Sequence, residues 1–146
     1  MTVTPSLSRQ FISSILFCVV LAPLLFTATV RAQAPSFNLS LSPATVGVGS
    51  CSELTFEVQN NSAVVVNDLA FSLNLPDGVY LSNPANAISD CGGVFVALDG
   101  GNTIALNGGA VDANSTCSAR VGITLLAEGP FDLTTGDLTS DAGNSG

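Results

Sequence analysis

The side chains that could do chemistry in this chain are eleven carboxylates, four cysteines and many hydroxyls. Histidine and lysine are absent, and there are only three arginines. Imidazole catalysis and histidine-bound metals are therefore excluded, and a serine or cysteine nucleophile has no base to activate it. Two acids could serve a glycosidase. However, the acids fall mostly in turns, where they are usually solvated or bonded to their own backbone. We therefore expect no enzymatic activity.

Calcium is the metal that the remaining donors suit, because it binds carboxylate, amide and carbonyl oxygens. Neither oxygen-rich stretch of the chain has the ligand spacing of a known calcium loop. We therefore expect ordinary polar loops and no cofactor, and keep calcium binding as part of the alternative function. The two stretches are Asp99 with Asn102, and Asp137 with Ser140, Asp141 and Asn144.

The charge balance excludes a nucleic-acid partner. The formal net charge is −8, and three cations cannot neutralise a phosphate backbone. All eleven acids follow Gln33, whereas two of the three arginines precede it. Without residues 1–32 the chain would keep one arginine against eleven acids, a net charge of −10. Such a surface stays soluble through self-repulsion.

Residues 1–32 have the pattern of a secretory signal peptide. A polar start with one arginine precedes an uncharged, largely apolar stretch over residues 11–30. Small residues then occupy the −3 and −1 positions of a cleavage site, and we expect cleavage between Ala32 and Gln33. Cleavage after Ala34 would place a proline next to the cut, so we prefer the earlier bond. Uncleaved, the same stretch could just span a bilayer, and it would be the only membrane contact of the chain.

The remaining sequence predicts an antiparallel β-sandwich. After a short linker at residues 33–35, apolar and polar residues alternate with the period of half-buried strands over residues 36–146. Asp99–Asn102 predicts a hairpin, and Asn107–Gly109 predicts another turn. We expect about seven short strands in two sheets. The alternating segments are 37–41, 54–58, 69–75, 94–96, 104–106 and 121–125, with a weaker last pair at Phe131–Leu133 and Leu138.

Six sequence motifs resemble one bacterial module when they are taken in order. They are Ser42–Gly49, Leu54–Asn60, Leu75–Val79, Cys91–Gly93, Ile104–Gly109 and Gly136–Ser140. Together they resemble the Ig-like "conserved repeat" domain of unknown function. That domain occurs in exported and cell-surface bacterial proteins, often in tandem, and in some of them before an IPTL-type C-terminal sorting tail. The resemblance covers Ser36–Gly146 and implies an Ig-like sandwich without an established activity.

The chain departs from that family pattern in having one copy and no sorting tail. It also stops where relatives usually continue into a final strand, so we expect that the last edge strand could be missing. The resemblance and the export pattern together predict a non-enzymatic structural or adhesive module of a bacterial exported or cell-envelope protein. It would be secreted, periplasmic or at the cell surface, with other envelope proteins or copies of itself as partners. A secreted calcium- or carbohydrate-binding domain is the alternative.

The cysteines point to one disulfide. Cys18 would leave with the signal peptide, and the three that remain predict one bridge and one leftover thiol. The family resemblance implies that Cys91 and Cys117 form the bridge. Cys51 is then either a buried inert thiol or a residue that bridges two chains. The chain has no CxxC pair, and oxidation after export disfavours a cysteine-bound metal.

Overall fold

The computed structural model describes residues 31–145, and the described chain is built from β-strands. The predicted signal segment up to residue 30 lies outside the described residues, so cleavage between Ala32 and Gln33 stays a prediction. The described residues contain no helix that is long and apolar enough to cross a membrane. The strands are β1 (Ser36–Ser42), β2 (Cys51–Asn60), β3 (Val66–Asn74), β4 (Val79–Leu81), β5 (Ile88–Ser89), β6 (Val94–Ala97), β7 (Thr103–Val111) and β8 (Ser115–Leu125).

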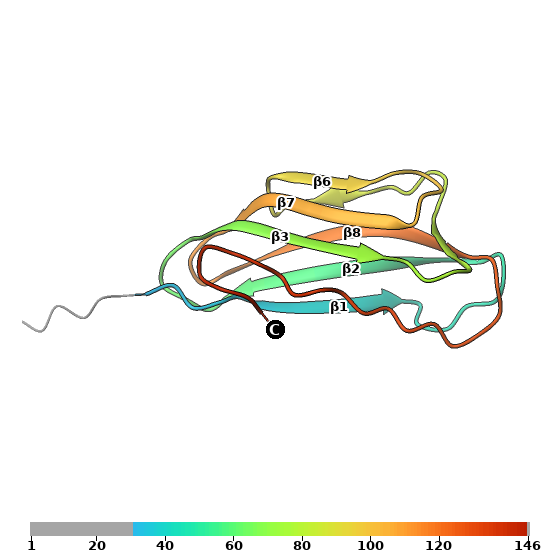
Figure 1. Ribbon diagram of the computed structural model, residues 1–146, viewed down its shortest axis with the longest axis horizontal. Coiled ribbons are helices and arrows are strands. Elements are labelled where there is room, and N and C mark those ends of the chain that lie inside the picture. Colours follow the sequence, from blue (N-terminus) through green and yellow to red (C-terminus); the bar gives the residue numbers. More distant parts are fainter. Residues whose placement is uncertain (1–30, 146) are drawn as a thin grey trace, which may run out of the picture.

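The strands form two antiparallel sheets that face each other (Figure 1). One sheet has the order β1-β2-β8-β4, with β5 also paired to β8, and the other has the order β3-β7-β6. The chain crosses between the sheets four times, after β2, β3, β5 and β7, so the two layers are tied together repeatedly along the sequence. The predicted all-β sandwich is confirmed, with eight strands in place of about seven.

Alternating side chains fill the space between the sheets, as the period-two pattern predicts. In β2 every second residue is buried and the intervening residues face outward. Three phenylalanines join β1, β2 and β3 at the centre of this core. The ring centroids of Phe56 and Phe71 are 4.7 Å apart. Those of Phe37 and Phe71 are 5.0 Å apart.

Asn60 ends β2 inside the core and holds two turns together. Its Nδ2 group donates to the carbonyl oxygens of Val64, Val111 and Asp112. Its Oδ1 atom accepts hydrogen bonds from the backbone nitrogen and the hydroxyl of Ser62. Asn60 is 1% exposed, so these bonds satisfy a side-chain amide that water does not reach.

The turns were predicted with mixed success. The hairpin at residues 99–102 is confirmed, because β6 pairs with β7 across it. The turn predicted at Asn107–Gly109 is wrong, because these residues lie inside β7. Leu69 pairs with Gly109 and Phe71 with Leu106, so β7 holds one extra residue between the two pairs. A β-bulge absorbs it, and Gly108 has the positive φ of 67° that the bulge requires.

The weak last strand pair predicted at residues 131–138 does not form. Phe131 and Leu133 are outside any strand and pack partly buried against the core. The chain regains strand pairing only in two isolated antiparallel bridges, Thr139 with Ala70 of β3 and Leu138 with Ser145. This C-terminal segment runs along the open side of the sandwich beside β1 and β3 (Figure 1). Its side chains therefore cover the core without completing a ladder of strand hydrogen bonds.

Candidate functional site

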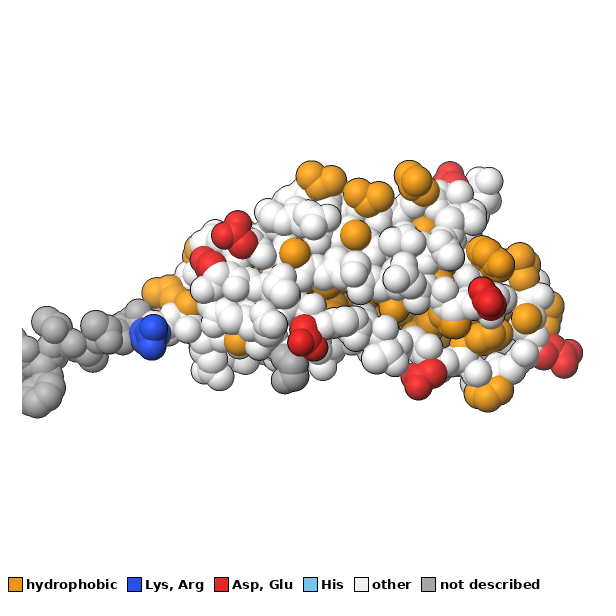
Figure 2. All heavy atoms as spheres, viewed as in Figure 1, with side chains coloured by type: hydrophobic (Ala, Val, Ile, Leu, Met, Phe, Trp, Pro, Cys, Tyr) orange, Lys and Arg blue, Asp and Glu red, His pale blue; other side chains and the backbone are white. Residues whose placement is uncertain are grey.

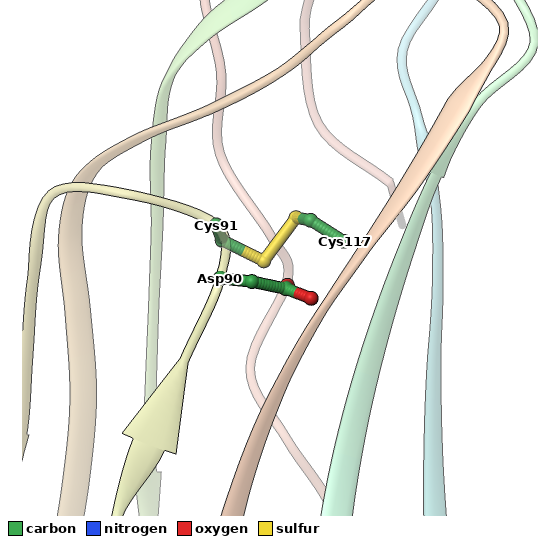
Figure 3. A group of neighbouring side chains, drawn as sticks. All are labelled: Asp90, Cys91 and Cys117. Atoms are coloured by element: carbon green, nitrogen blue, oxygen red, sulfur yellow. A yellow bond between two sulfur atoms is a disulfide. The ribbon is translucent and has the colours of Figure 1, made fainter.

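Asp90, Cys91 and Cys117 bring three side chains of metal-ligating types within 4.8 Å of one another in the described chain (Figure 3). Cys91 follows β5 and Cys117 lies in β8. The two sulfur atoms are bonded to each other at 2.09 Å, with Cα atoms 5.0 Å apart. The disulfide implied by the family resemblance is therefore confirmed. Because metals bind the thiolate form of cysteine, this group cannot supply two sulfur ligands while it is oxidised.

The Asp90 carboxylate is also engaged by the protein. It accepts a short hydrogen bond from the backbone nitrogen of Ser118 and a 3.5 Å bond from the Ser118 hydroxyl. The backbone nitrogen of Asp90 donates in turn to the Ser118 carbonyl oxygen at 3.0 Å. This arrangement fixes the short strand β5 to β8 beside the disulfide. The group therefore helps to hold this part of the fold together.

The candidate calcium ligands Asp99, Asp141 and Ser140 each form hydrogen bonds with other groups of the protein. Asp99 accepts a hydrogen bond from the backbone nitrogen of Ala85 at 2.8 Å. Both carboxylate oxygens of Asp141 accept bonds from Asn67, one from its backbone and one from its side chain. Ser140 donates to the carbonyl oxygen of Gly143. Turn acids that bond to backbone groups are the ordinary expectation for such loops.

Cys51 is the free cysteine of the described chain. It is the first residue of β2 and is exposed, so the expectation of a buried inert thiol is wrong. The reason lies in the alternation of β2, where Ser52 and Leu54 face the core and Cys51 and Glu53 face solvent. The Cys51 sulfur lies 3.5 Å from the Thr124 hydroxyl. The thiol remains accessible for an intermolecular bridge.

The outward faces of the two sheets differ in chemistry. The larger sheet presents polar and charged residues such as Glu53, Glu57 and Arg120. The smaller sheet ends in β6, where Val94 is 62% exposed and Val96 is 41% exposed. Leu98 follows on the same side of the chain and is 73% exposed. Apolar side chains accordingly line the upper rim of the molecule above β6 in Figure 2.

This surface, which we call the β6 rim (Val94, Val96 and Leu98), was missed by the sequence reasoning. The sequence predicts residues 94–96 as part of a half-buried strand but does not show that this strand lies at an edge. Only the alternate residues Phe95 and Ala97 pack against the core. The sequence does contain an indication of this surface. Residues 92–98 carry no charge and no proline, whereas natural edge strands usually carry one or the other, which prevents pairing with another chain.

The comparison with protein families follows the boundaries of the sandwich. A family described as a domain of unknown function, DUF7933, matches residues 35–146. The chain belongs to this family. The match confirms the part of the resemblance that concerns a domain of unknown function. A search of curated proteins found no match.

Two solved structures are similar to this family member at low sequence identity and low TM-score. The chitin-binding domain of Chi18aC from Streptomyces coelicolor is 11% identical with a TM-score of 0.44, over 77% of this chain and 94% of that domain. A Family GH18 chitinase from Chromobacterium violaceum is 14% identical with a TM-score of 0.37. The match covers 81% of this chain and 19% of the chitinase. We draw nothing about ligands from either similarity.

Proposed function

We propose that this domain is a non-enzymatic structural or adhesive module of a bacterial exported or cell-envelope protein. The observation that carries the proposal is the β6 rim, an uncharged apolar surface on an open strand edge. Unpaired strand edges and exposed apolar rows are surfaces at which proteins associate. Asp90 beside the disulfide and the calcium candidates Asp99 and Asp141 all accept hydrogen bonds from backbone groups.

Export is supported by two independent features. Residues 1–32 have the pattern of a signal peptide. The Cys91–Cys117 disulfide is the kind of bond that forms and persists in oxidising compartments outside the cytosol. A location in the periplasm, at the cell surface or in the medium accounts for both features.

The partner at the β6 rim is another envelope protein rather than a second copy of this chain. Two copies would each carry a net charge of −8, or −10 once residues 1–32 are removed. Like charges of this size oppose close approach, most strongly at low ionic strength. A partner of opposite or neutral charge that contributes an apolar strand would meet no such barrier.

The test replaces Val96 by glutamate and measures whether the exported protein still co-purifies with the cell envelope. We expect Val96→Glu to release the protein to the soluble fraction while the melting temperature stays within a few degrees. Ile88→Glu is the matched control, because Ile88 is also an exposed apolar strand residue but belongs to the other sheet. Equal retention of both variants would refute adhesion through the β6 rim.

A further inference from the structure

A cavity of about 300 Å³ opens at the end of the sandwich opposite the β2–β3 turn. It lies between β1, β4 and β8 on one side and residues 129–133 on the other. Leu41, Val79 and Ile123 supply its inner wall, and Phe131 and Leu133 supply its outer wall. Apolar side chains also gather on the surface at this end, on the right of Figure 2.

The outer wall belongs to a segment that we call the strap, residues 127–137. At one end of it, the backbone nitrogen of Leu126 donates to the carbonyl oxygen of Gly78 at 2.7 Å. At the other end, Thr139 pairs with Ala70. Between these points the strap makes no backbone hydrogen bond to any other described residue. Apolar packing alone holds its middle on the sandwich, so it can shift outward without breaking a ladder.

A second hollow of about 210 Å³ adjoins the cavity under the strap. The two share Leu41, Phe131 and Leu133 as lining residues, and the second extends along β1 to Leu39. Together they form an elongated trough, which we call the strap cleft. The strap cleft is long because the strap does not pair as a strand. An irregular segment cannot fill the space beside β1 as closely as a paired strand would.

The lining of the strap cleft defines the chemistry of a ligand. None of the lining residues is charged, and Thr45 and Ser40 supply the polar side chains. A charged group placed there would lose its hydration without a partner. The acidic domain would in addition repel anionic amphiphiles. The cavity volume lies at the lower limit of ligand sites, which is roughly 300 Å³, and is about twice that of an engineered cavity that holds benzene.

We propose that the strap cleft binds a small neutral molecule with an elongated hydrocarbon chain. The site is independent of the proposed adhesive function, because the β6 rim belongs to the other sheet. Binding would use the apolar walls for affinity and an outward movement of the strap for entry.

The first test uses the purified exported protein and the neutral dye N-phenyl-1-naphthylamine, whose fluorescence rises in apolar sites. We expect a saturable rise that 1-decanol reverses at a concentration at least tenfold below that of decanoate. The comparison isolates the effect of charge, because the two competitors have chains of the same length. No saturable rise, or equal competition by the two compounds, would overturn the proposal.

Variants then locate the dye. Ala44 is exposed and lines the cavity, so Ala44→Trp should block it and reduce dye binding at least fivefold. Ala63→Trp, in an exposed turn at the far end of the sandwich, should leave binding unchanged. If Ala44→Trp lowers the melting temperature, Thr45→Glu decides the question by placing a charge in the cleft. Dye binding that survives these cleft variants but is lost in Val96→Glu would belong to the β6 rim and would refute the strap cleft.

Discussion

Asp90 and Ser118 bond to each other through both backbone and side chains, immediately beside the Cys91–Cys117 disulfide. Strand β5, which directly precedes Asp90, is short, and only its residues Ile88 and Ser89 pair with β8. The covalent bond and the hydrogen bonds therefore fix the point at which the chain passes from β5 to β6. This places the acid and the cysteines, which are chemically the most reactive types in the chain, in a structural role.

Loss of the disulfide should lower the stability of the domain substantially. Closing a loop with a sequence separation of 26 stabilises the folded state by about 3.5 kcal/mol through the entropy of the unfolded chain. We expect the Cys91→Ser/Cys117→Ser variant to lose about this amount in guanidinium unfolding. Cys51→Ser is the control and should unfold at the wild-type midpoint, because Cys51 is exposed and unbridged. An unchanged midpoint for the double variant would contradict the role assigned to the bridge.

Asn60→Ala should be among the most destabilising single substitutions. The change removes five hydrogen bonds of a buried amide and leaves the buried carbonyl oxygen of Val111 and backbone nitrogen of Ser62 without this partner. Buried groups left unsatisfied cost about 1–3 kcal/mol each, so we expect a loss of roughly 3 kcal/mol by urea unfolding. Asn61→Ala alters the exposed neighbour and should change stability by less than about 0.5 kcal/mol. Similar losses for the two variants would show that the Asn60 network contributes little.

Gly92 and Gly93 offer a matched pair that separates backbone conformation from packing. Their φ angles are 67° and 66°. A Cβ atom on Gly92 would meet nothing within 4 Å, whereas one on Gly93 would lie 2.6 Å from the Gly109 nitrogen of β7. Gly92→Ala should cost about 1–2 kcal/mol for the left-handed conformation. Gly93→Ala should cost about 1–3 kcal/mol more for the added crowding. Equal thermal shifts would show that β6 and β7 can move apart freely at this point.

The intact mass of the non-reduced, alkylated protein tests cleavage and the cysteines together. We expect a chain that begins at Gln33, with one alkylated thiol at Cys51 and one bridge. The exposure of Cys51 predicts that alkylation proceeds without denaturant. A disulfide-linked dimer would make Cys51 an assembly residue. A mass that retains residues 1–32 would contradict the predicted cleavage and indicate an anchored protein.

The sandwich could be predicted from the sequence because its strong strands alternate cleanly. In β2, Leu54, Phe56 and Val58 recur every second residue and all three are buried. The same rule failed at Phe131 and Leu133, whose spacing indicated a strand. Their segment packs by side chains and does not enter a backbone ladder. The periodicity of apolar residues indicates which side chains face the core. Whether the backbone forms strand hydrogen bonds depends on segments that are distant in the sequence.

The candidate surfaces were harder to predict for a related reason. From the sequence alone, an apolar residue in an alternating stretch is expected to face the core. The sheet order shows that β6 lies at an edge, and the exposure of Val94 and Val96 shows that they face outward. The outward position of Cys51, in contrast, follows from the local alternation of β2, because Leu54, Phe56 and Val58 face the core and Cys51 is out of phase with them. The Cys91–Cys117 pair came from the family resemblance, since the count of three cysteines predicts one bridge without naming its members.

Photo-crosslinking at the β6 rim tests the central claim most directly. A photoreactive phenylalanine analogue replaces Val94 in the protein expressed in its native cells, and the matched control places it at Ile88. The account predicts a discrete adduct with one envelope protein from position 94 but not from 88, lost when Val96→Glu is added. An adduct with twice the mass of the chain would identify a second copy as the partner. No adduct, or the same adducts from both positions, would contradict the claim that this domain works by contact through β6.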